Sequence, residues 1–373
     1  MTFFEDKKPV AILKHAIMNQ YIDQFVGKTG LYSPGHRVAV IDGYAGEGRY
    51  ASGEEASPAM LMRKARELTR INRCLESYLV ESEPEPLAKL RHVIASEGAD
   101  LPVELFRGSI ADHLGHLLAR VKDVPLLVFL DPFGVMIPFI ATVEIFNQRP
   151  TQPPATELLI NFNASGLRRI AGLLNSEKVI PGKEAALARM DAACGSDWWR
   201  QKWLDHGDDH DAAEEGIVAE YARRLASSQR CGWWTTPVRN RAHQKPVYYL
   251  VFLTRHPDGF IAFGEALSLG MQRWREALHE IVNANTFFGD EAAFKASEKV
   301  LADGWVNEIE ANLRRLLSEG RPFKIFDRYG DVFGSAAGQA REMHLRAAWK
   351  RLHPGVTRTD SKGDLIKKVI EPA

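Results

Sequence analysis

Short apolar runs that alternate with helical segments are the feature that most constrains how this chain can fold. The first run, RVAVID at 37–42, is rich in β-branched residues and is typical of a buried strand. Four similar runs follow it: SYLVES (77–82), VELF (103–106), PLLVFLD (125–131) and ELLINFN (157–163). Helical spacing appears between them, for example at 85–97 and 111–121. This alternation predicts βαβ units, and therefore an α/β fold with a mostly parallel sheet.

The stretch 247–264, VYYLVFLTRHPDGFIAFG, has two apolar runs around a Pro-Asp-Gly turn. That pattern favours a β-hairpin and predicts that an antiparallel last strand closes the sheet. Helical character is expected at 9–27, at 165–232 and from about residue 285 onward.

Composition narrows the classes of protein further. The 373 residues include 48 Lys and Arg in total and 48 Asp and Glu in total, so the formal net charge is zero. This balance excludes a protein that binds nucleic acid through a high overall positive charge, but it allows a local basic face. No apolar run approaches the roughly 20 residues of a membrane span, and the start MTFFEDKKPV does not resemble a signal peptide. Three widely spaced cysteines indicate neither a disulfide framework nor a metal site. We expect a cytoplasmic protein that needs no membrane and no metal.

The stretch VAVIDGYAGEGRY (38–50) takes the first predicted strand into a glycine-rich turn. Such a turn can leave backbone N–H groups free to face a ligand, and glycine lets the chain approach that ligand closely. Its spacing, G-x-x-G-x-G, is neither the G-x-G-x-x-G of dinucleotide folds nor a P-loop. A corner without a ligand is the alternative. The candidate cofactor-binding residues of this turn are Asp42, Gly43, Tyr44, Ala45, Gly46 and Gly48.

Polar residues, most of them acidic, also stand at the ends of the second and third predicted strands. Glu81 ends the second, where a carboxylate can accept hydrogen bonds from ribose hydroxyls, and Ser109 and Asp112 follow the third. The alternative for Glu81 is a solvated strand end.

The fourth strand runs into Asp131, Pro132, Phe133 and Gly134. The Asp131 carboxylate or the adjoining backbone carbonyl can accept a hydrogen bond from an amine, while the Phe133 ring stacks on a planar base. A plain Pro-Gly turn with Phe133 in the core is the alternative.

Basic residues gather between Tyr221 and Tyr249, where no Asp or Glu occurs and two tryptophans interleave. This stretch could bind a single-stranded or flipped target. Its tryptophans would stack on bases, and the phosphates of the target would be bound by Arg239, Arg241 and Lys245. An exposed helix face with a core tryptophan pair is the alternative. Lys14 and His15, on the first helix, are further candidates for closing over a cofactor or contacting phosphate.

These strand ends together resemble the class I S-adenosylmethionine-dependent methyltransferases. The resemblance implies a Rossmann-like sheet, with Asp42 and the glycines holding the amino-acid end of the cofactor. It also implies that Glu81 holds the ribose and that Asp131 orients the reacting amine. The third strand departs from the pattern, because Ser109 stands where an aspartate often follows the glycine.

Four segments narrow the resemblance: KHAIMNQYI, IDGYAGEGRY, ASPAM and FLDPFG. They are similar to the three-Cys-motif partner (TcmP) family over most of residues 10–165. The resemblance implies a neighbouring three-Cys-motif protein as a partner. The DPFG tetrad is also similar to that of tRNA guanosine-N2 dimethyltransferases, which favours the exocyclic amine of a DNA or RNA base as the acceptor.

On this interpretation the chain divides into four parts. Residues 1–164 hold the cofactor turn and DPFG, and 165–232 form a helical insertion that is a candidate for target recognition. Residues 233–284 complete the core with a hairpin and a helix, and 285–373 form a helical, winged-helix-like module. We expect an enzyme that N-methylates a nucleic-acid base. The alternatives are a cofactor-binding partner subunit without activity of its own and an NAD-dependent oxidoreductase.

Overall fold

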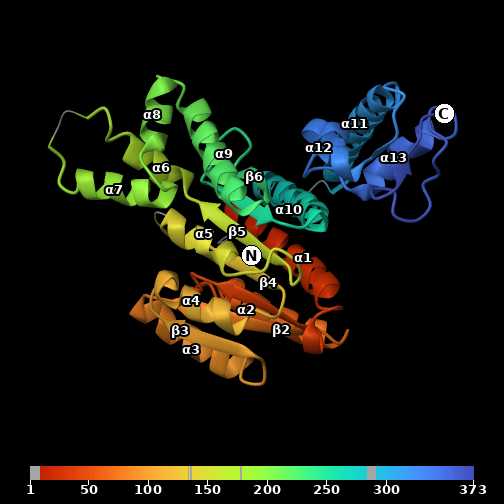
Figure 1. Cartoon of the computed structure of the whole chain (residues 1–373). Helices are drawn as coiled ribbons and strands as arrows, with labels where there is room; N and C mark the ends of the chain where they lie inside the picture. The colour runs from red at the N-terminus through yellow and green to blue at the C-terminus, as the bar shows by residue number, and fades with distance from the viewer. Residues whose placement is uncertain (1–8, 133, 135–136, 177–178, 284–290) are drawn as a thin grey trace. The chain divides into compact units, whose positions relative to one another are not determined.

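The computed structural model describes residues 9–132, 134, 137–176, 179–283 and 291–373. The chain forms two compact units (Figure 1). One comprises Ile22–Phe260, and the other combines the N-terminal segment up to Tyr21 with Ile261–Ala373. The four-part division expected from the sequence stays a prediction.

The unit Ile22–Phe260 is built on a seven-stranded sheet of order β3-β2-β1-β4-β5-β7-β6. The strands are β1 (Arg37–Asp42), β2 (Cys74–Glu81), β3 (Val103–Arg107), β4 (Leu126–Leu130), β5 (Thr156–Phe162), β6 (Gly232–Val238) and β7 (Tyr248–Thr254). The first five pair in parallel, whereas β7 runs antiparallel to both β5 and β6. This mostly parallel sheet with an antiparallel last strand is Rossmann-like, so the predicted fold class is confirmed.

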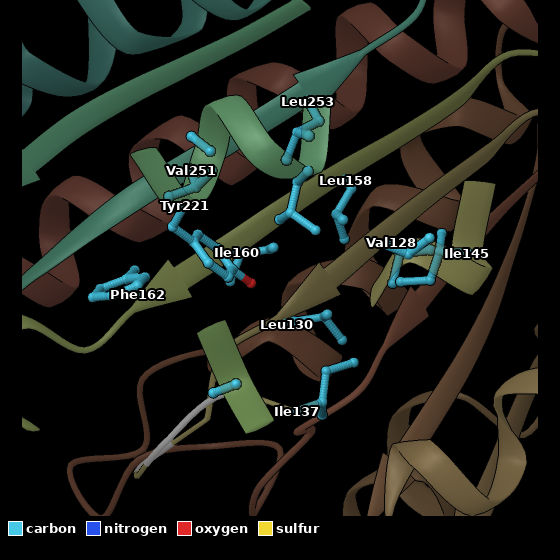
Figure 2. Packing of buried hydrophobic residues seen from close by; sticks show 14 of the residues in the cluster. Val128, Leu130, Ile137, Ile145, Leu158, Ile160, Phe162, Tyr221, Val251 and Leu253 are labelled. Atoms are coloured by element: carbon cyan, nitrogen blue, oxygen red, sulfur yellow. The ribbon is translucent and has the colours of Figure 1, made fainter. Parts of the chain in front are cut away.

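Helices cover this sheet. In chain order they are α2 (Ser57–Thr69), α3 (Pro84–Glu97), α4 (Ile110–Arg120), α5 (Phe139–Asn147), α6 (Ala164–Ala171), α7 (Lys183–Cys194), α8 (Trp198–Asp205) and α9 (His210–Gln229). On one face, alternate strand residues such as Val128, Leu130, Ile160 and Val251 pack against helical residues that include Tyr221 of α9 (Figure 2). Both faces of the central strands are buried, which explains why their sequences are continuously apolar.

The prediction of a hairpin within 247–264 is wrong for its second strand. From Pro257 the chain is helical, in α10 (Pro257–Asn283), and the antiparallel partner of β7 is the preceding strand β6. The Pro-Asp-Gly sequence begins a helix because proline lacks the N–H that the first helical position leaves unused. The buried residues that follow, Phe263 and Leu267, are four apart, as one face of a helix requires.

The second unit is mainly helical. It contains the first part of α1 (Pro9–Thr29) and nearly all of α10, and then α11 (Glu291–Leu317), β8 (Phe323–Lys324), α12 (Tyr329–Phe333), α13 (Glu342–Leu352) and β9 (Val369–Ile370). A hydrophobic core that includes Ile309, Phe333 and Trp349 joins α11, α12 and α13. Among the described residues, no helix has the length and apolar character needed to cross a membrane.

Candidate active site

The predicted site residues of the sheet lie at one edge. Asp42 pairs in register with Phe129 of β4 and with Leu79 of β2, so Asp131 and Glu81 follow two residues beyond those pairs. The carboxyl ends of parallel strands form the edge at which α/β folds place ligands. Three carboxylates predicted from separate strand ends therefore share one edge of the sheet.

Backbone N–H groups of the glycine turn already have hydrogen-bond partners within the protein. The N–H of Tyr44 donates to Asp42 Oδ1 (3.2 Å), that of Gly46 to Glu81 Oε2 (2.7 Å), and that of Ala45 to a carbonyl of β2 (2.9 Å). The expectation that the turn leaves these N–H groups free for a ligand is wrong. A ligand beside the turn would instead contact the carboxylate oxygens of Asp42 and Glu81.

The glycines of the turn have different reasons to be glycine. Gly46 and Gly48 have φ of 65° and 85°, in the left-handed region that disfavours other residues. A Cβ on Gly43 would lie 2.8 Å from Leu130, whereas a Cβ on Gly46 would meet nothing within 4 Å. Gly43 is thus required by packing, and Gly46 borders open space. The side chain of Tyr44 packs against the hydrophobic core, and burial raises the pKa of its phenol to about 12.

Glu81 connects three segments that meet at this edge. Its two carboxylate oxygens accept from the N–H of Gly46 and the N–H of Glu83, each at 2.7 Å. Its carbonyl accepts from the N–H of Gly108 at 3.0 Å. Each carboxylate oxygen has two lone pairs, so Glu81 keeps acceptor capacity for hydroxyl groups.

Ser109 and Asp112 form the N-terminal cap of α4. The Ser109 hydroxyl and backbone N–H both donate to Asp112 Oδ2, and the Asp112 N–H donates back to the hydroxyl. The hydrogen bond from the Ser109 hydroxyl lowers the pKa of Asp112. This capping box explains both residue types locally, so their contact with a cofactor stays a prediction.

Asp131 lies half-buried directly after β4 and is not isolated. Asn161 of β5 donates from Nδ2 to Asp131 Oδ1. Burial, together with the charge of Asp131, raises the pKa of the Tyr248 phenol well above its ordinary value. Pro132 is buried, and Phe133 lies outside the described residues.

Sequence reasoning missed Asn161 and Tyr248. The signal for Asn161 was present, because Asn161 and Asn163 end the fifth apolar run as NFN. Asn163 caps α6 by accepting from the N–H of Gly166 (2.8 Å), and its Nδ2 donates to the carbonyl of Gly134 (3.3 Å). No sequence pattern marked Tyr248, because its position beside Asp131 depends on the antiparallel insertion of β7.

The basic residues proposed to bind the target lie in the loop between β6 and β7. Because Val238 pairs with Tyr248 and Phe162 with Tyr249, this loop lies at the same edge as Asp131. Arg241 is exposed in it, and Lys245 forms an ion pair with Asp211 (2.7 Å).

Two arginines of the same acid-free stretch have another role. Arg223 and Arg224 are on α9 and both donate to Glu220, just outside the stretch. Trp233 is 37% exposed on the strand β6.

Lys14 and His15 lie half-buried on the part of α1 that belongs to the other unit. Their contact with a cofactor or phosphate stays a prediction. Among the described residues, no group of three His, Cys, Asp or Glu side chains could hold a metal ion.

Comparison with known proteins gives similarity at the level of structure. No family model and no curated protein matches the sequence. A putative rRNA methylase from Clostridium thermocellum aligns with a TM-score of 0.34 and 13% identity, over 64% of this chain and 94% of that chain.

Two methyltransferases solved with SAH are also similar. The plantazolicin methyltransferase BamL has a TM-score of 0.36 and 10% identity, over 67% of this chain and 86% of its own. An O-methyltransferase from Bacillus cereus has a TM-score of 0.33 and 13% identity, over 65% of this chain and 80% of its own.

Proposed function

We propose that this chain is an S-adenosylmethionine-dependent methyltransferase of the TcmP family that N-methylates an exocyclic amine of a nucleic-acid base. The observation that carries the proposal is the shared sheet edge. Asp42, Glu81 and Asp131 follow three strands in register there, and the β6–β7 loop with Arg239 and Arg241 lies at the same edge.

The residues at β1 and β2 fit the cofactor. Open space beside Gly46 leaves room for a ligand against the backbone, and Glu81 retains acceptor capacity for two ribose hydroxyls. The carboxylate of Asp42 would attract the α-ammonium group of the amino-acid end. When bound, S-adenosylmethionine supplies an electrophilic methyl group.

The residues at β4 and β5 fit a planar amine. Asp131 would accept a hydrogen bond from the amine and so direct its lone pair toward the methyl group. Asn161 holds the Asp131 carboxylate by donating to Oδ1. Fixing an acceptor in advance removes the need to reorganise it during the reaction, which accounts for much of the catalysis in sites of this kind.

The cofactor assignment is tested by calorimetric titration of S-adenosylmethionine. Asp42→Asn keeps an oxygen that can accept from Tyr44 but removes the charge, and we expect it to weaken binding at least about tenfold. Glu76→Gln is the matched control, because Glu76 is a buried carboxylate near the start of β2, where it pairs with Arg37. Equal affinities of the two variants would contradict the assignment of Asp42.

The reaction is tested by transfer of a labelled methyl group to total RNA and to denatured DNA. We expect Asp131→Asn to reduce transfer by about 100-fold and to leave the cofactor affinity unchanged. A wild-type chain that binds the cofactor but transfers to neither nucleic acid would support the alternative, a partner subunit that works with a three-Cys-motif protein.

A further inference from the structure

The last part of the chain has a defined topology that methyl transfer does not use. After α11 the chain forms β8, α12 and α13, and then two extended segments. The second of these, β9, pairs antiparallel with β8, and Thr357 of the first bridges Pro372 just beyond β9. Three helices with one strand after the first helix and an antiparallel partner strand after the third are the arrangement of a winged helix. In it α13 takes the place of the helix that enters a DNA groove, and residues 358–368 form the wing loop.

The wing loop is held against α13 by two side chains of that helix. Arg346 donates to the carbonyl of Ser361 (2.5 Å) and to that of Gly363 (2.6 Å). The buried Trp349 donates from its indole to the carbonyl of Thr359 (2.9 Å). Helix and loop therefore form one fixed surface, which would lose little conformational freedom on binding.

One side of α13 is accessible. Met343 is 62% exposed, and Ala347 and Lys350, at the i+4 and i+7 positions, lie on the same side of the helix. The other side packs into the core of the unit through Leu345, Ala348, Trp349 and Leu352. The accessible side and the wing loop are called the helix–wing face below.

The segment that carries this face has an excess of positive charge. Residues 341–373 contain eight Lys and Arg and four Asp and Glu, a net charge of +4 in a chain whose net charge is zero. Several of these cations are paired, such as Arg351 with Glu310 and Lys368 with Asp360. Lys350, Arg358 and Lys362 are exposed, and none of the ion pairs between described residues includes them.

We propose that the helix–wing face binds double-stranded nucleic acid. Lys350, Arg358 and Lys362 contact its phosphates, and the accessible side of α13 faces a groove. The charge of a duplex complements the excess of cations, and an α-helix fits the width of the DNA major groove. This binding goes beyond the proposed methyl transfer and does not depend on it.

The test uses the full-length chain and labelled duplexes of about 20 base pairs, one of DNA and one of RNA, with fluorescence anisotropy at several salt concentrations. The variant Lys350→Glu, Arg358→Glu, Lys362→Glu should weaken binding at least about tenfold. It should also reduce the slope of log Kd against log salt by about 2 to 3, since each lost phosphate contact removes about 0.9.

The matched control is Lys295→Glu, Lys299→Glu, Arg315→Glu, which makes the same change in charge at exposed positions of α11. It should bind the duplex nearly as the wild type does. Equal weakening by the control, or no binding of either duplex by the wild type at low salt, would overturn the proposal. A preference for one duplex identifies the target as DNA or RNA.

S-adenosylmethionine titration separates this proposal from the proposed function. The triple variant should keep the wild-type cofactor affinity, because its substitutions lie outside the unit that holds Asp42 and Glu81. If the triple variant does not fold, Lys362→Glu alone, on the exposed wing loop, should still reduce the salt slope by about 1.

Discussion

The carboxylate of Asp131 has neighbours that come from two other strands. Asn161 donates to it from β5, and Tyr248, at the start of β7, lies close enough to be affected by its charge. A hydrogen bond to a charged group contributes about 1.5 to 3 kcal/mol when it is buried. The amide thus helps to hold the Asp131 carboxylate in one orientation.

Asn161→Asp would place a second carboxyl group beside Asp131. Two adjacent carboxylates resist double ionisation, so the pKa of one of them rises. On the proposed mechanism the Asp131 carboxylate accepts a hydrogen bond from the amine, so the acid limb of the pH–rate profile should move to higher pH by about one unit or more. Profiles of wild type and variant, with the cofactor saturating, measure the shift. Superimposable profiles would mean that Asn161 is not beside the reacting carboxylate in the working enzyme.

At the scale of elements, α9 is stabilised on its exposed side by a carboxylate between two cations. Hydrogen bonds from Arg223 and then Arg224, with their charges, lower the pKa of Glu220 to about 2. A depressed carboxyl pKa stabilises the folded state above the unfolded pKa of about 4.3, and this stabilisation is lost as the pH falls toward 2.

Glu220→Gln should therefore lower the free energy of unfolding by about 1 kcal/mol at pH 7, because solvent screens a partly exposed pair. The difference between variant and wild type should shrink between about pH 5 and pH 2. Urea unfolding at several pH values measures it. A difference that stays constant down to pH 2 would show that ionisation of Glu220 contributes nothing.

The elements also show what sequence alone can predict. Strands β1, β4 and β5 were predicted because both of their faces are buried, which leaves an unbroken apolar run. β6 was missed because it mixes exposed Trp233 with threonines and Pro237. The start of α10 was misread because Pro-Asp-Gly suits both a turn and a helix N-terminus.

Within the site, the carboxylates at strand ends could be predicted because they are polar residues at the ends of apolar runs. Asn161 belongs to the same class, because it ends the fifth apolar run, whereas Tyr248 is brought to this edge by β7, which pairs with β5 in the opposite direction. Long-range pairing of that kind leaves no local pattern.

At the scale of the molecule, the antiparallel insertion of β7 brings the β6–β7 loop to the edge that carries Asp131. A target held by this loop would reach the reacting carboxylate without crossing the sheet. Except for Lys14 and His15, the unit Ile22–Phe260 thus contains the candidate cofactor-, amine- and target-binding residues together.

Arg239→Glu with Arg241→Glu should raise the KM for a single-stranded nucleic acid about tenfold or more at low salt, and less at high salt. The kcat should change little, because neither arginine is proposed to contact the amine. Arg70→Glu with Arg91→Glu, at exposed positions after α2 and on α3, is the matched control. Steady-state transfer assays measure both, and an unchanged KM would remove the loop from the binding surface.

The bonds made by Glu81 have a consequence for how the protein folds. The bond from Gly46 closes a loop of 35 residues, and the carbonyl bond to Gly108 draws in the end of β3. The glycine turn therefore has little shape of its own that could form early, because two of its three hydrogen bonds depend on contacts distant in sequence. A partly folded chain lacks the site, so cofactor binding during refolding would report completion of the sheet.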